Sequence, residues 1–214
     1  LAYVHEKGIC HRDIKLENFV FDSEEIDAQI LLIDFGMAVR LGPGEEVEDG
    51  MSTLFYMAPE MFYHYHAHVA KTGGNVLYNN KVDGCSSHTH VMSMRELSSL
   101  YDRSGGAALG SGANGSVATA TRLSSGEVVA LKTMAVDSEL PPADGLRMLL
   151  EDCEMQRCLD HPNIAPVFDV FLDVDSRMVV FAMPLGKGGS VASHLQRHPS
   201  LGERAKAAIA RKML

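Results

Sequence analysis

The segment that most constrains this chain is HRDIKLEN, from His11 to Asn18, in which charged and amide side chains follow one another closely. Asp13 can accept a proton from a hydroxyl nucleophile. Lys15, two residues later, can neutralise charge that develops on a transferring phosphoryl group. Asn18 supplies an oxygen of the hard kind that Mg²⁺ prefers. The spacing therefore predicts acid–base chemistry beside a metal-bound phosphate.

Two further stretches extend this pattern. LIDFG, at residues 32–36, provides Asp34 as a second oxygen ligand for a metal. The apolar run QILLI, at residues 29–33, leads directly into it and is typical of a buried strand. MSTLFYMAPE, at residues 51–60, contains Thr53 and ends at Glu60. Residues 1–60 thus carry three short motifs in a fixed order.

A glycine-rich stretch, LGSGANGSV at residues 109–117, fits the pattern G-x-G-x-x-G-x-V. Glycines let the backbone approach a polyphosphate closely, with its N–H groups facing the oxygens. A dinucleotide-binding turn shares this pattern but needs a helix after the glycines. Here Val117 and Thr119 follow, which favours a hairpin. The candidate phosphate-binding residues are Leu109, Gly110, Ser111, Gly112, Ala113, Asn114, Gly115, Ser116 and Val117.

The next motif, VALK at residues 129–132, lies in a run that is typical of a strand. Strand side chains alternate between the two faces, so Ala130 and Lys132 share one face. A small residue there leaves room for a flat base, and the ammonium group two residues later can reach phosphates. Because VALK follows the glycine hairpin, Lys132 is a strong candidate for a phosphate ligand.

Hydrophobic patterning predicts helices over 1–7, closed by Gly8, and over 190–196 and 201–214. A further helix is expected to open at Pro141 and Pro142 and to run to about Leu159. Strands are expected at 18–21, 29–33, 127–136, 165–171 and 177–183, with a strand–turn–strand over 107–121. Residues 61–95 show no sustained period. We therefore divide the chain into 1–60, a linker at 61–95, and 96–214.

Composition excludes several classes of function. The 214 residues carry a net charge of −9, which disfavours nucleic acid as a partner because phosphate binding needs a basic surface. Apolar residues make up 46%, enough for a sizeable core. There is no apolar run of the roughly 18–20 residues that cross a membrane, and no signal peptide is visible. We therefore expect a cytoplasmic protein without nucleic-acid or membrane partners.

Taken together, these motifs resemble the protein kinase family of the serine/threonine type. Lys15 and Thr53 mark the serine/threonine side. The stretch between Asn18 and Asp34 (FVFDSEEIDAQILLI) is most similar to the calcium/calmodulin-dependent and calcium-dependent branches. The resemblance covers residues 1–60 and 97–214. It implies an α+β fold, with an antiparallel small-lobe sheet plus one helix and an incomplete helical large lobe.

The resemblance also implies an activity: ATP-dependent phosphoryl transfer to Ser/Thr hydroxyls of protein substrates, with ATP and Mg²⁺ as cofactors. By this resemblance Asp13 would be the catalytic base, Lys15 the γ-phosphate contact, and Asn18 and Asp34 the metal ligands. Lys132 would hold the α- and β-phosphates. The glycine stretch and Ala130 would complete the ATP site. Glu17 would favour substrates with basic side chains upstream of the target hydroxyl.

Further residues take supporting roles by the same resemblance. Phe35 would pack beside His11 in an apolar stack. Met183 would guard the back of the ATP pocket, and residues 184–186 would form the hinge. The acidic stretch at 45–49 would supply charge opposite Arg12 in place of a phosphate, or would simply be a solvated loop.

One helical acid would pair with Lys132. A Glu is expected nine residues before the His of HPNI, where this chain has Asp152, and Glu151 stands one residue earlier. Asp is one methylene shorter than Glu, so its reach to Lys132 is in question. The sequence leaves both residues open.

The motif order is reversed relative to the family, because the glycine stretch and VALK follow HRD rather than precede it. In addition, AKAAIARKML at the end of the chain would continue into LAYVHEKGICHRD at its beginning. Two explanations stay open: a fragment of a tandem kinase array, or a chain that folds as a circular permutant.

The chain contains no Trp, and we expect the later helices of a large lobe to be missing. Glu60 would then lack its usual partner and should be exposed. This suggests an alternative function, a catalytically impaired nucleotide-binding or scaffolding fragment.

Overall fold

The computed structural model describes all residues except 26, 42–90, 113–114, 137–141 and 214. For residues 142–144 and 152 it describes the helical backbone but not the side chains. The chain divides into two units, each treated separately below. The first contains Leu1–Lys15 and Met37–His88, and the second contains Leu16–Gly36 and Thr89–Leu214. No helix in the described part of the chain is long and apolar enough to cross a membrane.

In the first unit, helix α1 (Ala2–Glu6) ends just before Gly8. Gly8 adopts φ +68°, and a Cβ there would lie 2.8 Å from the carbonyl oxygen of Leu41, so glycine is needed for both reasons. Strand β1 (Ile9–Cys10) then pairs antiparallel with β4 (Val39–Arg40). The predicted helix closed by Gly8 is therefore confirmed.

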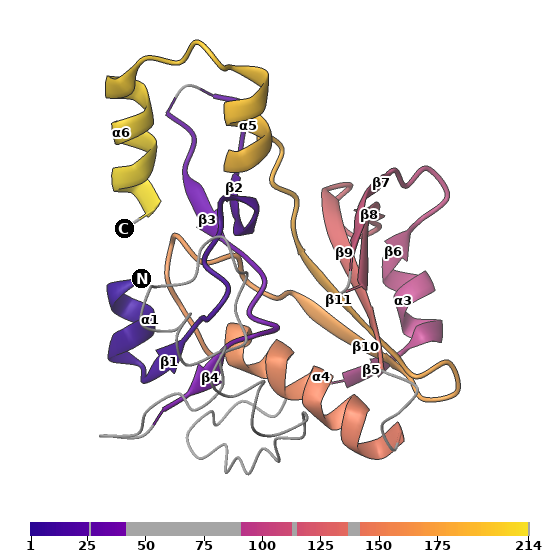
Figure 1. Cartoon of the computed structure of the whole chain (residues 1–214). Helices are drawn as coiled ribbons and strands as arrows, with labels where there is room; N and C mark the ends of the chain where they lie inside the picture. Colours follow the sequence, from indigo (N-terminus) through magenta and orange to yellow (C-terminus); the bar gives the residue numbers. More distant parts are fainter. Residues whose placement is uncertain (26, 42–90, 113–114, 137–141, 214) are drawn as a thin grey trace. The chain divides into compact units, whose positions relative to one another are not determined.

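The second unit is built around a seven-stranded sheet in the order β5-β10-β11-β9-β8-β6, with β7 also pairing with β8 (Figure 1). All pairs are antiparallel except the edge pair β5–β10. The strands are β5 (Val91–Ser93), β6 (Tyr101–Asp102), β7 (Ala108–Gly112), β8 (Gly115–Arg122), β9 (Val128–Ala135), β10 (Asp169–Asp173) and β11 (Met178–Pro184).

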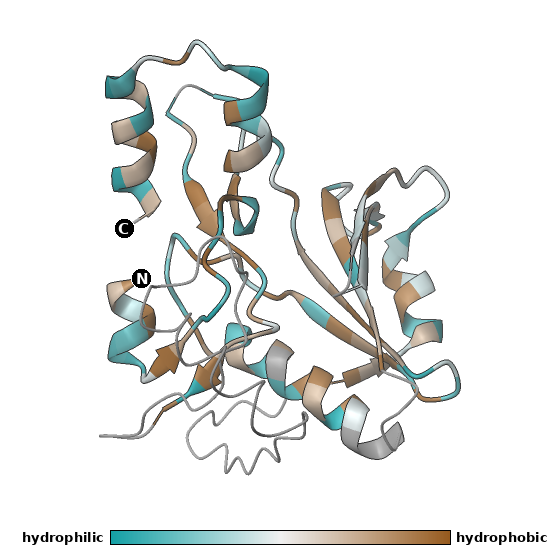
Figure 2. Cartoon of the chain, viewed as in Figure 1, coloured by the Kyte–Doolittle hydropathy of each residue, from teal (hydrophilic) through white to brown (hydrophobic). Residues whose placement is uncertain are grey.

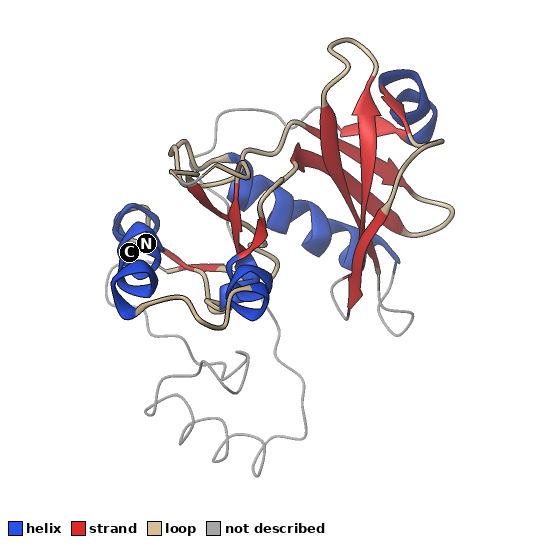
Figure 3. Ribbon diagram, turned by 90° about the horizontal axis from the view of Figure 1, so that it is seen from above, coloured by secondary structure: helices blue, strands red, loops and turns tan. Residues whose placement is uncertain are grey.

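Helices cover this sheet on both faces (Figures 1 and 3). On one face α4 (Pro142–Arg157) packs through Leu146 and Cys153 on Ala130 and Met134 of β9. On the other face α3 (Met94–Leu100) packs through Leu97. The core on that face also contains Val129 and Leu131 of β9, together with Tyr101, Ala120, Phe171, Val180 and Ala182. The alternation of β9 therefore divides the core into two layers.

Tyr101 fixes the α3 side of the sheet through polar contacts. Its hydroxyl donates to the carboxylate of Asp169, which also accepts from Arg122 Nη2 at 3.2 Å. Burial and the neighbouring Asp169 carboxylate raise the pKa of Tyr101. The phenol therefore stays protonated and keeps its donor role.

The α+β class and the antiparallel sheet with its covering helix are confirmed, but helix α3 is not among the helices expected from the sequence. Strand β5 and the first residues of α3 lie inside the segment 61–95 that was assigned to a linker. A local signal was present, because Ser93 and Glu96 form a capping box in which the Ser93 N–H donates to Glu96 Oε2 at 2.7 Å.

A smaller sheet in the second unit has the order β12-β2-β3, formed by Gly189–Ser190, Phe19–Phe21 and Ile30–Leu32. The 3-10 turn η1 (Leu16–Asn18) precedes β2. Helix α5 (Val191–Arg197) follows β12 and is capped by Ser190, whose Oγ accepts from the Ser193 N–H at 3.1 Å. Strands β2 and β3 and helix α5 match the elements expected from the sequence, whereas β12 was not among the expected strands.

Helix α6 (Glu203–Met213) contains no buried residue. Figure 2 shows both polar and apolar residues along it. Lys212 Nζ joins the helix to the connection between β2 and β3 by donating to the carbonyl oxygens of Asp27 and Ala28 at 3.2 and 2.8 Å. The helix expected over 201–214 is therefore confirmed over Glu203–Met213.

Replacing Leu97 by Ala tests the α3 layer. Leu97 is fully buried, so Leu97→Ala should lower the free energy of unfolding by about 2–5 kcal/mol. Leu100→Ala, on the same helix at a side chain 36% exposed, should change it by less than about 0.5 kcal/mol. Urea unfolding of the two variants makes the comparison, and equal stabilities would contradict the packing described here.

Candidate functional site

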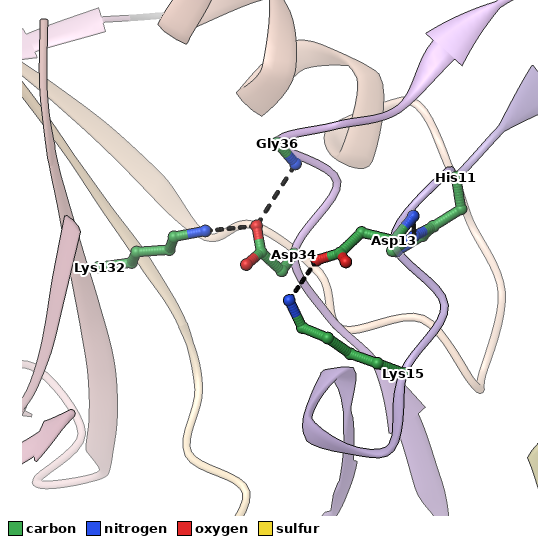
Figure 4. Close-up of polar contacts among 6 residues, drawn as sticks. All are labelled: His11, Asp13, Lys15, Asp34, Gly36 and Lys132. Carbon is green, nitrogen blue, oxygen red and sulfur yellow. Dashed lines mark hydrogen bonds and ion pairs between the residues drawn. The ribbon is translucent and has the colours of Figure 1, made fainter. Parts of the chain in front are cut away.

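Lys132 lies at the centre of the large sheet, opposite Val117 of β8 and Phe181 of β11. Its side chain is 8% exposed, and its Nζ contacts Asp34 Oδ1 at 2.5 Å (Figure 4). The two residues are 98 positions apart in the sequence. A buried ammonium group needs such a partner, because an unpaired charge in the interior is costly. The structure thus brings together two residues predicted to bind the same phosphorylated ligand.

Asp34 is held in an uncommon backbone conformation, φ +64°. Asp tolerates this left-handed region better than most residues. The Gly36 N–H donates to Asp34 Oδ1 at 3.4 Å, so the same oxygen faces both Gly36 and Lys132 (Figure 4). A strained conformation of this kind is often retained where a side chain must be aimed at a ligand.

Asn18 is tied to the segment that carries Asp34. The Ile33 N–H donates to the Asn18 carbonyl oxygen at 2.9 Å, and Asn18 is buried. One amide oxygen and one carboxylate therefore come from neighbouring backbone segments. Two hard oxygen donors of this kind fit Mg²⁺, which binds to one or two protein oxygens and otherwise to water and phosphate.

The glycine stretch forms the predicted hairpin. Gly110, Ser111 and Gly112 in β7 pair with Val117, Ser116 and Gly115 in β8, while Ala113 and Asn114 at the turn lie outside the described residues. Gly115 adopts φ +110°, and a Cβ there would lie 2.0 Å from the Thr133 carbonyl oxygen. A Cβ at Gly110 would instead meet no atom of the described residues within 4 Å.

The remaining predicted residues of the sheet lie on the same face as Lys132. Ala130 pairs with Met183 across β9 and β11, and both side chains are buried in the α4 layer. Pro184 is the last residue of β11, and the chain continues from it towards β12. These positions are compatible with the expected roles of Met183 at the back of the ATP pocket and of residues 184–186 as the hinge.

In the first unit, the HRD segment makes its own contacts. His11 and Asp13 are buried, and the Asp13 N–H lies 2.8 Å from the His11 carbonyl oxygen and 3.3 Å from its Nδ1. Lys15 Nζ contacts Asp13 Oδ2 at 2.6 Å (Figure 4). Arg12 adopts φ +59° and its Nε donates to the Met37 carbonyl oxygen at 2.6 Å. Asp13 and Lys15 are thus neighbours, as their predicted shared role requires.

Several predicted residues cannot be placed in this way. Thr53, Glu60 and the acidic stretch 45–49 lie outside the described residues, as does the side chain of Asp152. Phe35 is 1% exposed in the second unit, and its stacking on His11 stays a prediction because His11 belongs to the first. Glu151 pairs with Arg147 on α4 at 3.7 Å, and Glu17 is exposed.

A cavity of about 700 Å³ lies between the β2–β3 turn and helices α5 and α6, lined by residues such as Phe21, His194 and Ile209. None of the candidate site residues in the described part of the chain lines it. The candidate nucleotide-binding and metal-binding residues of this unit therefore lie outside the cavity.

The family model of the protein kinase domain matches residues 1–78 and 104–214, which together make up most of the chain. The chain belongs to the protein kinase family. The matched region 1–78 contains the HRD and LIDFG segments, and the matched region 104–214 contains the glycine hairpin and Lys132. The family expectation drawn from these motifs is thereby confirmed.

Curated kinases resemble the chain over shorter stretches. A CDPK-related protein kinase of Daucus carota is 40% identical over 63 residues, which is 29% of this chain and 10% of that protein. Calcium-dependent protein kinase 22 of Oryza sativa subsp. japonica is 44% identical over 57 residues, covering 27% and 10% of the two proteins. Calcium-dependent protein kinase 11 of Arabidopsis thaliana is 44% identical over 57 residues, or 27% and 12%. These matches span about a tenth of each relative's length.

The two hairpin glycines should respond differently to substitution. Gly115→Ala should lower the free energy of unfolding by at least about 1–3 kcal/mol, because of its positive φ and its contact with Thr133. Gly110→Ala should stay within about 0.5 kcal/mol without nucleotide, since its Cβ would meet open space. Thermal and urea unfolding distinguish the two variants, and the reverse ranking would contradict the hairpin geometry.

Proposed function

We propose that this kinase-family chain transfers the γ-phosphoryl group of ATP to Ser or Thr hydroxyls of protein substrates, with Mg²⁺. The observation that carries the proposal is the contact between Lys132 and Asp34. It unites, within one unit, the strand lysine and the LIDFG carboxylate whose order along the chain is reversed. This supports a chain that folds as a circular permutant over a fragment of a tandem kinase array whose two pieces do not assemble.

Nucleotide binding is assigned to the second unit. Lys132 would hold the α- and β-phosphates, the glycine hairpin would face them through its N–H groups, and Ala130 would leave space for the base. Asn18 and Asp34 would hold Mg²⁺. Bound there, the ion would neutralise charge on the phosphates. The Nζ of Lys132 would then exchange part of its contact with Asp34 for phosphate oxygens.

Phosphoryl transfer is assigned to the HRD segment. Asp13 would accept the proton of the substrate hydroxyl. The oxygen of that hydroxyl would bond to the γ-phosphorus while the bond between the γ-phosphorus and the β–γ bridging oxygen breaks, which leaves ADP. Lys15, in contact with Asp13, would balance charge on the transferring group. The exposed Glu17 would favour substrates with basic side chains upstream of the hydroxyl.

A second candidate is a fragment that binds nucleotide without transferring phosphate. It is favoured by Glu151, one of the two α4 acids that the sequence left open as a partner of Lys132, because in the described part of the chain Glu151 pairs with Arg147 and Lys132 pairs with Asp34. Binding of Mg²⁺–ATP with no phosphorylation of peptides by the wild-type chain would select this candidate over the enzyme.

Binding is tested through Asp34. ATP should raise the Tm of the wild-type chain, and Mg²⁺ should raise it further. Asp34→Asn should remove the Mg²⁺-dependent increment, because an amide is a poorer Mg²⁺ ligand than a carboxylate. Asp175→Asn, at an exposed turn residue, serves as the matched control and should keep it. An Mg²⁺ increment that survives Asp34→Asn would refute the metal assignment.

Transfer is tested through Asp13. Asp13→Asn should lower peptide phosphorylation by about 10²–10⁴-fold, because the proton acceptor is lost. The Tm increase with Mg²⁺–ATP should remain, since Asp13 has no assigned role in nucleotide binding. Phosphorylation at the wild-type rate would show that Asp13 is not the base.

A further inference from the structure

The buried face of α4 is apolar up to its last turn, where a polar residue replaces the pattern. Leu146 and Cys153 are buried, and the next residue on this face, Gln156, is 2% exposed. Burying an amide costs free energy unless it is hydrogen-bonded. Gln156 Nε2 donates to the Ala165 carbonyl oxygen at 2.8 Å. The residue therefore joins the helix to a segment beyond it, in addition to filling space.

The segment that Gln156 reaches, residues 162–165, is bonded to β3 along its length. The Leu32 N–H donates to the Asn163 carbonyl oxygen at 2.7 Å, and the Ala165 N–H donates to the Leu32 carbonyl oxygen at 3.0 Å. Asn163 Nδ2 adds a bond to the Ile30 carbonyl oxygen at 2.9 Å. The segment thus lies beside β3 like a short parallel strand, with Ile164 opposite Leu32.

Strand β3 leads directly to Asp34. Leu32 is its last residue, and Ile33 then bonds to the Asn18 carbonyl oxygen. A continuous path therefore runs from Gln156 through Ala165 and Leu32 to the carboxylate that faces Lys132. We propose that Gln156 is a positioning residue that couples α4 to Asp34, and so sets the metal-binding geometry. This assignment rests on the proposed function of Asp34 as a Mg²⁺ ligand.

Gln156→Met isolates the hydrogen bond, because methionine has a similar length but no donor. The affinity for Mg²⁺–ATP should fall about fivefold to tenfold, while the affinity for ATP without Mg²⁺ should stay within about twofold. Asn163→Ala, which removes the bond to Ile30, should have the same effect. In the double variant the fold-decrease in Mg²⁺–ATP affinity should be smaller than the product of the two single fold-decreases, because both substitutions act through segment 162–165.

The control is Leu146→Val, which removes a buried methylene group from the same face of α4. Without ligand, hydrogen exchange of the Leu32 and Ile33 amides should be faster in Gln156→Met and in Asn163→Ala than in the wild type. The increase should exceed the change in Leu146→Val when the variants are compared at equal global stability. This readout does not depend on activity, and Asn163→Ala supplies the test should Gln156→Met fail to fold.

The outcomes separate the two proposals. Unchanged Mg²⁺–ATP affinity and unchanged β3 exchange in the variants, with normal binding by the wild type, would overturn the role of Gln156 alone. A wild-type chain whose nucleotide binding ignores Mg²⁺ would overturn the proposed function, and the assignment of Gln156 with it. A selective loss of the Mg²⁺ effect, with faster exchange at Leu32 and Ile33, would support the coupling.

Discussion

The contact between Lys132 and Asp34 is the interaction on which the arrangement of this chain depends. Both side chains are largely removed from water, with 8% and 18% exposure. Removing one member of such a pair typically costs about 3–5 kcal/mol, because the remaining charge is left buried alone. The folded state must therefore keep Lys132 and Asp34 in contact, although they are 98 positions apart in the sequence. This requirement links the start of the chain to its middle.

The hydrophobic layers decide where Lys132 points. Along β9, Ala130 and Met134 face α4, whereas Val129 and Leu131 face the layer under α3. Lys132 follows the first set, so it enters the α4 side of the sheet. A shift of one residue in register would move it to the opposite face and break the contact with Asp34. Core packing and site geometry are thus fixed by the same alternation.

Much of the second unit could be predicted because its signals are local. The glycine pattern with strand residues after it predicts the hairpin, and helical periodicity predicts α4, α5 and α6. The pairing of β5 with β10 and the bond from Gln156 to Ala165 could not be found this way, since both join residues through tertiary structure. For Lys132 the sequence left Asp152 and Glu151 of α4 open as partners. Glu151 pairs with Arg147 on its own helix, and the side chain of Asp152 lies outside the described residues, so pairing with Asp152 stays a prediction.

Intramolecular cross-linking tests the central claim most directly. A carbodiimide activates carboxylates and joins them to an adjacent ammonium group as an amide, with loss of water and no spacer. A mixture of unlabelled and ¹⁵N-labelled chains should yield a linked peptide pair containing Asp34 and Lys132 with both peptides of one isotope, and Lys132→Arg should abolish it. Absence of this pair, or pairs that combine the two isotopes, would show that the motifs do not meet within one chain.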